Sequence, residues 1–325
     1  MEIAVLASHR FIPILTLLMA GLSGVGMLAQ GRPVSHVGTL SSSQDEVDSL
    51  ASVRSLLREE RLSEAEAEAR RYLASHAESG PAHFLLGLIL FRENKAKDSL
   101  AEFTNGARFS VPSANDLKVV ALDYVLIDDY DDAQKWLIES TKRDASDPMA
   151  WYSLGRVQFK LNVFQDAEKS FRHCLQLDPQ NVKAEDNLGL TLAALNRTDE
   201  AIAAYRQAIA WQVNSNHPSE QPLLNLGSIL IERNQLDEAT RLLEQAVAIA
   251  PKDPKIHEEL GQVYSLQDNL GKAAGHLEQA VALSPNDSRL HFQLGQVYRK
   301  LGLTEKAKAE FERTAALTGT HSTPD

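Results

Sequence analysis

Residues 151–179 read WYSLGRVQFKLNVFQDAEKSFRHCLQLDP, and this stretch decides the fold because its landmarks recur along the chain. The landmarks are Trp151, the pair Leu154-Gly155, Ala167, Phe171 and Pro179. The small residue returns every 34 residues, with one step of 38, at Ala65, Ser99, Ala133, Ala167, Ala201, Ala239, Ala273 and Ala307. A fixed period of this length predicts a solenoid of helix–turn–helix units.

The other landmarks keep the same phase. Leu-Gly recurs at Leu86-Gly87, Leu188-Gly189, Leu226-Gly227, Leu260-Gly261 and Leu294-Gly295. A bulky residue stands four places after the small one in most units, at Phe103, Leu137, Phe171, Tyr205, Leu243, Leu277 and Phe311. Glycine and alanine suit the points where paired helices cross closely, and proline forces the turn into the next unit.

These residues resemble the tetratricopeptide repeat family, whose Trp-x-x-Leu-Gly pattern matches Trp151 to Gly155. The resemblance implies an all-α fold, a right-handed superhelical solenoid of about eight helix–turn–helix repeats. It covers residues 46–321, with repeats that start near 46, 80, 114, 148, 182, 220, 254 and 288 and a tail at 322–325. The first three repeats are degenerate, since Val53 and Ala121 stand where the family has glycine.

Composition limits the classes of function. The chain has 325 residues and a formal charge of −11, which argues against nucleic acid as a partner because the phosphate backbone needs a basic footprint. An array of repeats shares one continuous core, so we expect a single elongated domain. The one cysteine, Cys174, stands where other repeats have alanine, so we expect a small buried apolar residue.

The N-terminus differs in character from the array. Residues 11–29 are apolar and uncharged, so residues 1–30 are predicted to be a signal peptide or an N-terminal membrane anchor, followed by a polar linker at 31–45. We therefore expect an exported protein, periplasmic or secreted. The alternative is a protein anchored in the membrane by this segment if it stays uncleaved.

The histidines and carboxylates that could hold a metal ion have structural explanations in the repeat. His83, His257 and His291 share one position of the repeat, where successive units lie too far apart to hold one ion, so we expect packing residues. Asp131 and Asp132 are expected to open a second helix, where negative charge suits the helix dipole. No residue constellation indicates catalysis, a metal or a cofactor, so the protein is predicted not to be an enzyme.

The family resemblance implies that the first helices line a concave groove. The residue before Leu-Gly is expected to face this groove, and the consecutive Asn187 and Asn225 there resemble part of an asparagine ladder that holds extended peptides. Gln293 extends the ladder, although Glu259 interrupts it. Chance occurrence of asparagine at this position stays open as the alternative. The aromatic residues predicted to face the same groove in the N-terminal half are Phe84, Phe91, Tyr152 and Phe159.

Two further expectations concern the edges of the array. The four extra residues near 216–219 predict a longer second helix through Trp211 and a loop after it. The last helix, with Lys306, Lys308 and Arg313, is expected to close the array with a polar outer face.

Taken with the groove, these features predict a non-enzymatic scaffold that binds a protein or peptide partner. Its alternatives are a membrane-tethered assembly factor for an envelope complex and an accessory subunit of an enzyme.

Overall fold

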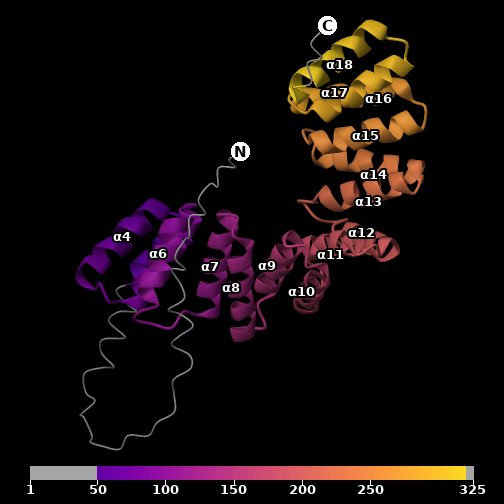
Figure 1. Cartoon of the computed structure of the whole chain (residues 1–325). Helices are drawn as coiled ribbons and strands as arrows, with labels where there is room; N and C mark the ends of the chain where they lie inside the picture. The colour runs from indigo at the N-terminus through magenta and orange to yellow at the C-terminus, as the bar shows by residue number, and fades with distance from the viewer. Residues whose placement is uncertain (1–49, 320–325) are drawn as a thin grey trace, which may run out of the picture. The chain divides into compact units, whose positions relative to one another are not determined.

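The computed structural model describes residues 50–319, which form sixteen α-helices and no strand (Figure 1). The helices alternate along the chain as first and second members of eight pairs. The first helices are α3 (Ala51–Arg58), α5 (Gly80–Arg92), α7 (Ala114–Leu126), α9 (Pro148–Lys160), α11 (Val182–Ala194), α13 (Gln221–Glu232), α15 (Pro254–Leu266) and α17 (Ser288–Lys300). The second helices are α4 (Leu62–Ser75), α6 (Ala96–Gly106), α8 (Tyr130–Arg143), α10 (Phe164–Leu177), α12 (Thr198–Trp211), α14 (Leu236–Ile249), α16 (Leu270–Leu283) and α18 (Thr304–Thr318). The all-helical fold with eight helix pairs is confirmed.

The chain divides into two compact units between Leu161 and Asn162. Unit 1 contains α3 to α9 and unit 2 contains α10 to α18, and each unit is described by itself. The predicted signal peptide or anchor, the linker and the tail at 322–325 lie outside the described residues.

Local sequence signals start and stop each helix. Several first helices begin with a side-chain cap; Ser113, for example, accepts a hydrogen bond from the Asp116 amide in a capping box. The turn between the two helices of every pair contains one residue with φ near +60 to +74°. These residues are Glu60, Asn94, Asp128, Asn162, Asn196, Asn234, Asp268 and Gly302. Asparagine, aspartate and glycine tolerate this left-handed conformation best, which leaves Glu60 as the strained member.

The two helices of a pair are held together by matched side-chain volumes. A Cβ atom added to Gly87 would lie 2.8 Å from the Phe103 ring, and one added to Gly261 would lie 2.5 Å from Cγ of Leu277. Gly189, Gly227 and Gly295 meet Tyr205, Leu243 and Phe311 in the same way. The first repeat reverses the sizes. Val53 stands in the glycine position and Ala69 in the bulky one, and both are fully buried.

A buried polar pair interrupts the core of unit 1. The Ser99 hydroxyl oxygen lies 2.8 Å from the Gly87 carbonyl oxygen and 2.5 Å from Oδ2 of Asp123, whose side chain is fully buried. The Ser99 hydroxyl has one hydrogen for these two acceptors, and protonation of Asp123 supplies a second hydrogen to the cluster, so that Ser99 can donate to Gly87 while Asp123 donates to Ser99. Burial raises the pKa of Asp123 to about 7, although the bond with Ser99 opposes the rise.

The extra residues of the fifth repeat form a loop. The predicted longer second helix is wrong: α12 ends at Trp211 and has 14 residues, as α14 and α16 do. The next residue, Gln212, is buried and holds the loop through both the nitrogen and the oxygen of its side-chain amide. Its Nε2 donates to the Ser219 carbonyl oxygen at 2.7 Å, and its Oε1 accepts from the Ser219 amide at 2.8 Å. This clamp ends the helix and closes the insertion on itself.

Candidate functional site

The first helices line the inner side of each unit. Within unit 1, α5 contacts α7 and α7 contacts α9, and within unit 2, α11 contacts α13 and α13 contacts α15. Second helices of adjacent repeats make no comparable contact within the described part of either unit. Because first helices crowd together and second helices spread apart, the first helices occupy the inside of the curve. We call the surface of α11, α13, α15 and α17 on this side the inner face of unit 2.

The two predicted asparagines of the inner face differ in their partners. Nδ2 of Asn187 donates to the Lys183 carbonyl oxygen of its own helix at 2.8 Å. Nδ2 of Asn225 donates instead across the repeat boundary to Oδ1 of Asp186, also at 2.8 Å. Asp186 is 6% exposed, and burial raises its pKa to about 6 against the lowering effect of the Asn225 bond. Asn225 therefore connects α13 to α11.

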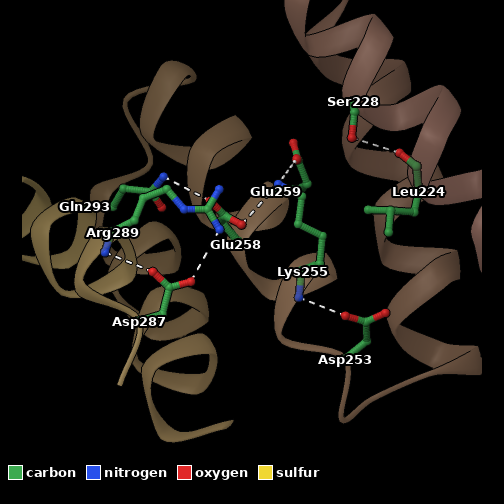
Figure 2. A network of polar contacts seen from close by, with 9 residues as sticks. All are labelled: Leu224, Ser228, Asp253, Lys255, Glu258, Glu259, Asp287, Arg289 and Gln293. Atoms are coloured by element: carbon green, nitrogen blue, oxygen red, sulfur yellow. Dashed lines mark hydrogen bonds and ion pairs between the residues drawn. The ribbon is translucent and has the colours of Figure 1, made fainter. Parts of the chain in front are cut away.

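Gln293 repeats this arrangement two boundaries further along, between α15 and α17. Its Nε2 donates to Oε1 of Glu258 on the preceding first helix at 3.1 Å (Figure 2). Glu258 is 3% exposed and also lies 3.1 Å from a guanidinium nitrogen of Arg289. In both cases an amide bonds to the buried carboxylate one repeat earlier. The shared geometry shows that these amides join neighbouring first helices.

Charged groups extend the network around Glu258. Nζ of Lys255 lies 2.8 Å from Oε1 of Glu259 and 3.1 Å from Oε2 of Glu258. Burial alone would lower the pKa of Lys255, but the bonds to Glu259 and Glu258 outweigh it and raise the pKa. Figure 2 shows Arg289 and Gln293 on one side of Glu258 and Lys255 with Glu259 on its other side. Paired charges and amides thus join α15 to α17 on the inner face of unit 2.

The four predicted aromatic residues lie in unit 1 with different exposure. Phe84 is 8% exposed and belongs to the hydrophobic core, where its ring stacks on Phe103 at 6.0 Å between centroids. Phe91 is half-buried and packs against the same core. Tyr152 and Phe159 are half-buried on α9, and the Arg156 guanidinium carbon lies 5.8 Å from the centre of the Tyr152 ring. Peptide binding by these four residues, and by the three amides, stays a prediction.

The three repeat-position histidines have structural partners. Nε2 of His83 lies 3.0 Å from the Ala77 carbonyl oxygen, and Nδ1 lies 2.6 Å from Oε2 of Glu102. His257 and His291 likewise meet the carbonyl oxygens of Pro251 and Pro285, six residues earlier. These bonds join each first helix to the preceding loop, which is the structural role predicted. Within residues 50–319, no cluster of three His, Cys, Asp or Glu side chains is arranged to hold a metal ion.

Other sequence predictions are met at single residues. Cys174 is fully buried, as are its counterparts Ala208 and Ala246. Asp131 and Asp132 lie in the first turn of α8, as the dipole argument predicted. None of the helices in the described residues is long and apolar enough to cross a bilayer.

Models of known families match most of the array. Three models described as tetratricopeptide repeat match the chain, one of them at residues 50–115, 121–182 and 224–288. The others match residues 181–252 and 264–321.

Curated relatives share only segments of their length with this chain. It is 26% identical over 115 residues to cell division cycle protein 27 homolog B of Arabidopsis thaliana, which is 35% of this chain and 15% of that protein. It is 24% identical over 173 residues to Hsp70-Hsp90 organizing protein 1 of Glycine max, 51% of this chain and 29% of that protein. The match thus spans less than a third of either relative.

Solved structures share the fold at low identity. PilW, a type IV pilus biogenesis factor, matches 64% of this chain and 95% of its own with a TM-score of 0.58 and 23% identity. A chain of the APC/C hetero-tetramer Cut9-Hcn1 is also similar. The match covers 88% of this chain and 55% of that chain, with a TM-score of 0.58 and 17% identity. At these identities the likeness establishes the fold alone.

Proposed function

Because this chain belongs to the tetratricopeptide repeat family, we propose that it is a non-enzymatic scaffold that holds an extended protein segment on the inner face of unit 2. The observation that carries the proposal is the row of hydrogen-bonding side chains on consecutive first helices, from Asn187 on α11 to Gln293 on α17. An extended segment offers both N–H and C=O groups, and amide side chains pair with either.

We expect the three amide side chains to act differently in binding, because their hydrogen-bond acceptors differ. The side chain of Asn187 donates to the Lys183 carbonyl oxygen in its own helix. When this side chain turns away, the carbonyl oxygen still accepts its helical backbone hydrogen bond. Asn187 can therefore reach a ligand at small cost. Asn225 and Gln293 hold buried carboxylates, and leaving such a carboxylate unpaired is costly. These two residues support binding by keeping the inner face rigid.

A photo-crosslinking experiment tests the location of the ligand. A photoreactive amino acid replaces Gln262, which is exposed on α15 one turn after Glu258, and a matched variant carries it at Gln279, exposed on α16. We expect the full chain to capture a discrete partner in host extract from position 262 and not from 279. Asn187→Ala should lower the yield at 262. Capture at 279 alone, or equally at both positions, would contradict the proposal.

The aromatic residues of unit 1 form a separate part of the proposal. Tyr152 and Phe159 lie two turns apart on α9 and are half-buried, so both keep ring surface for an apolar side chain of the partner. Tyr152→Ala should weaken binding of the captured partner, while Phe84→Ala should instead destabilise the core. Unchanged affinity in the Tyr152 variant would remove this contact.

Export is also proposed, on the apolar residues 11–29. Cleavage would release a periplasmic or secreted scaffold, and retention of the segment would give a membrane-tethered assembly factor. Fractionation of cells expressing the full chain, with N-terminal sequencing of the product, distinguishes the two. A full-length product in the cytosolic fraction would contradict both.

A further inference from the structure

The last helix pair consists of α17 and α18, which are labelled in Figure 1. Two open apolar clefts lie beside Phe311 on this pair. One cleft has a volume of about 410 Å³ and is bounded by Phe292, Gln296 and Thr314. The other has about 430 Å³ and is bounded by Thr304, Ala307, Lys308 and Glu312. Arg299, Phe311 and Ala315 line both. We call this surface the end face of unit 2. The sequence predicted a polar outer face here, but Phe292 is 45% exposed.

The same surface is covered by a helix in the preceding repeats. There α12 packs against α13, α14 against α15, and α16 against α17. The counterparts of Phe311 in those second helices, Tyr205, Leu243 and Leu277, are at most 2% exposed. Phe311 itself is half-buried, and no helix of residues 50–319 covers α18 in this way. The end face therefore continues the stacking interface of the repeats without its next helix.

The charge of the end face differs from that of the chain. The charged residues that line its clefts are Arg299, Lys308 and Glu312, a net charge of +1, while the whole chain has −11. Arg299 stands beside the clefts with its guanidinium carbon 5.9 Å from the centre of the Phe311 ring. Lys308 lines the second cleft with Glu312, whose Oε1 lies 3.9 Å from Nζ of Lys308 on the exposed surface of α18. These cations favour a partner with carboxylates and disfavour a symmetric pairing of two end faces.

We propose that the end face of unit 2 binds an acidic amphipathic helix of another protein. The apolar side of that helix fills the clefts beside Phe311, as the next first helix does in the interior repeats. Its carboxylates lie against Arg299 and Lys308. This site is separate from the inner face, so it adds a second binding surface to the scaffold.

Fluorescence anisotropy with a defined peptide tests the proposal. The probe is a labelled peptide with the sequence of residues 253–267, because this segment already covers a second helix within the array and carries a net charge of −2. We expect saturable binding to the full chain below about 1 mM, weakened by added salt. A peptide with lysine in place of both glutamates should bind at least about tenfold more weakly.

Two protein variants locate the binding. Ala315→Arg fills both clefts and should reduce affinity at least about tenfold, while Ala309→Arg, at an exposed site on the same helix, should leave it within about twofold. Crosslinking from position 262 should be unchanged in both. No saturable binding by the full chain, or equal loss in both variants, would overturn the proposal. A dimer of the full chain that Ala315→Arg dissociates would also overturn it, because the occupant would then be a second copy.

Discussion

Replacing Asp123 by valine should stabilise unit 1 and remove most of a pH dependence that its buried carboxyl imposes. The equivalent residue is valine in three other repeats, at Val157, Val263 and Val297, so the backbone accommodates the side chain. The variant leaves Ser99 free to donate its single hydrogen to the Gly87 carbonyl oxygen. The substitution leaves no charged group without its partner, because burial and the hydrogen bond with Ser99 are the causes of the shifted pKa of Asp123.

The magnitude follows from the two ionisation constants. In the unfolded chain the carboxyl ionises above its ordinary pKa of 3.8, while in the folded chain it stays neutral until about 7. Between these values the folded state binds more protons, so the free energy of unfolding falls as pH rises, and it levels off above the folded pKa. The wild-type protein should lose about 2.5 kcal/mol between pH 5 and pH 8 through this group.

Tryptophan fluorescence during urea unfolding measures the effect in unit 1. A Trp211→Phe background removes the tryptophan of unit 2, so that Trp136 and Trp151 report on unit 1 alone. Free energies at pH 5, 6, 7 and 8 are compared with those of the Asp123→Val variant in the same background. The difference between the two proteins should grow with pH. A constant difference, or one that shrinks as pH rises, would refute the protonated Asp123.

Three further changes test other features of the array. Glu60→Gly relieves a left-handed residue at φ 58° and should raise the free energy of unfolding by about 1 kcal/mol in urea titrations; a loss would show that the turn is unstrained. Gly261→Ala should destabilise unit 2 by about 1–3 kcal/mol, and adding Leu277→Ala should recover part of the loss; additive losses would contradict volume matching. His276→Glu gives His257 a carboxylate partner, as His83 and His291 have. Burial and then the charge of His257 lower the pKa of His276, so the wild-type protein loses stability as pH falls below about 6.5. Melting scans should show the variant gaining most at acidic pH, and a gain confined to alkaline pH would contradict this.

The sequence predicted the helix pairs because the 34-residue period records a packing requirement that each pair must satisfy locally. It did not predict the partners of Asn225 and Gln293, since Asp186 and Glu258 lie 39 and 35 residues away. The two sequence separations differ by four residues, which is the length of the insertion in the fifth repeat. Without the insertion, both bonds would therefore join residues 35 positions apart. A search for carboxylates one repeat before each amide would have found them.

Other misses have physical causes of the same kind. Ser99 was counted as one more small residue, because its need for an acceptor becomes visible only when Asp123 is seen beside it. Phe84 was placed on the groove by its repeat position, but the aromatic ring of Phe103 stacks against it within the core. Periodicity assigns a residue to a helix, whereas burial depends on the sizes of neighbours from other helices.

The reversed sizes at Val53 and Ala69 affect how such an array can be recombined. The first repeat fits a large residue on one helix against a small one on the other, and the later repeats do the opposite. A hybrid pair that joined α3 to α6 would therefore bring Val53 against Phe103 and overfill the crossing. Joining α5 to α4 would leave Gly87 opposite Ala69 with a void. Recombination that preserves the fold must therefore exchange whole helix pairs, because the two matched side chains have to move together.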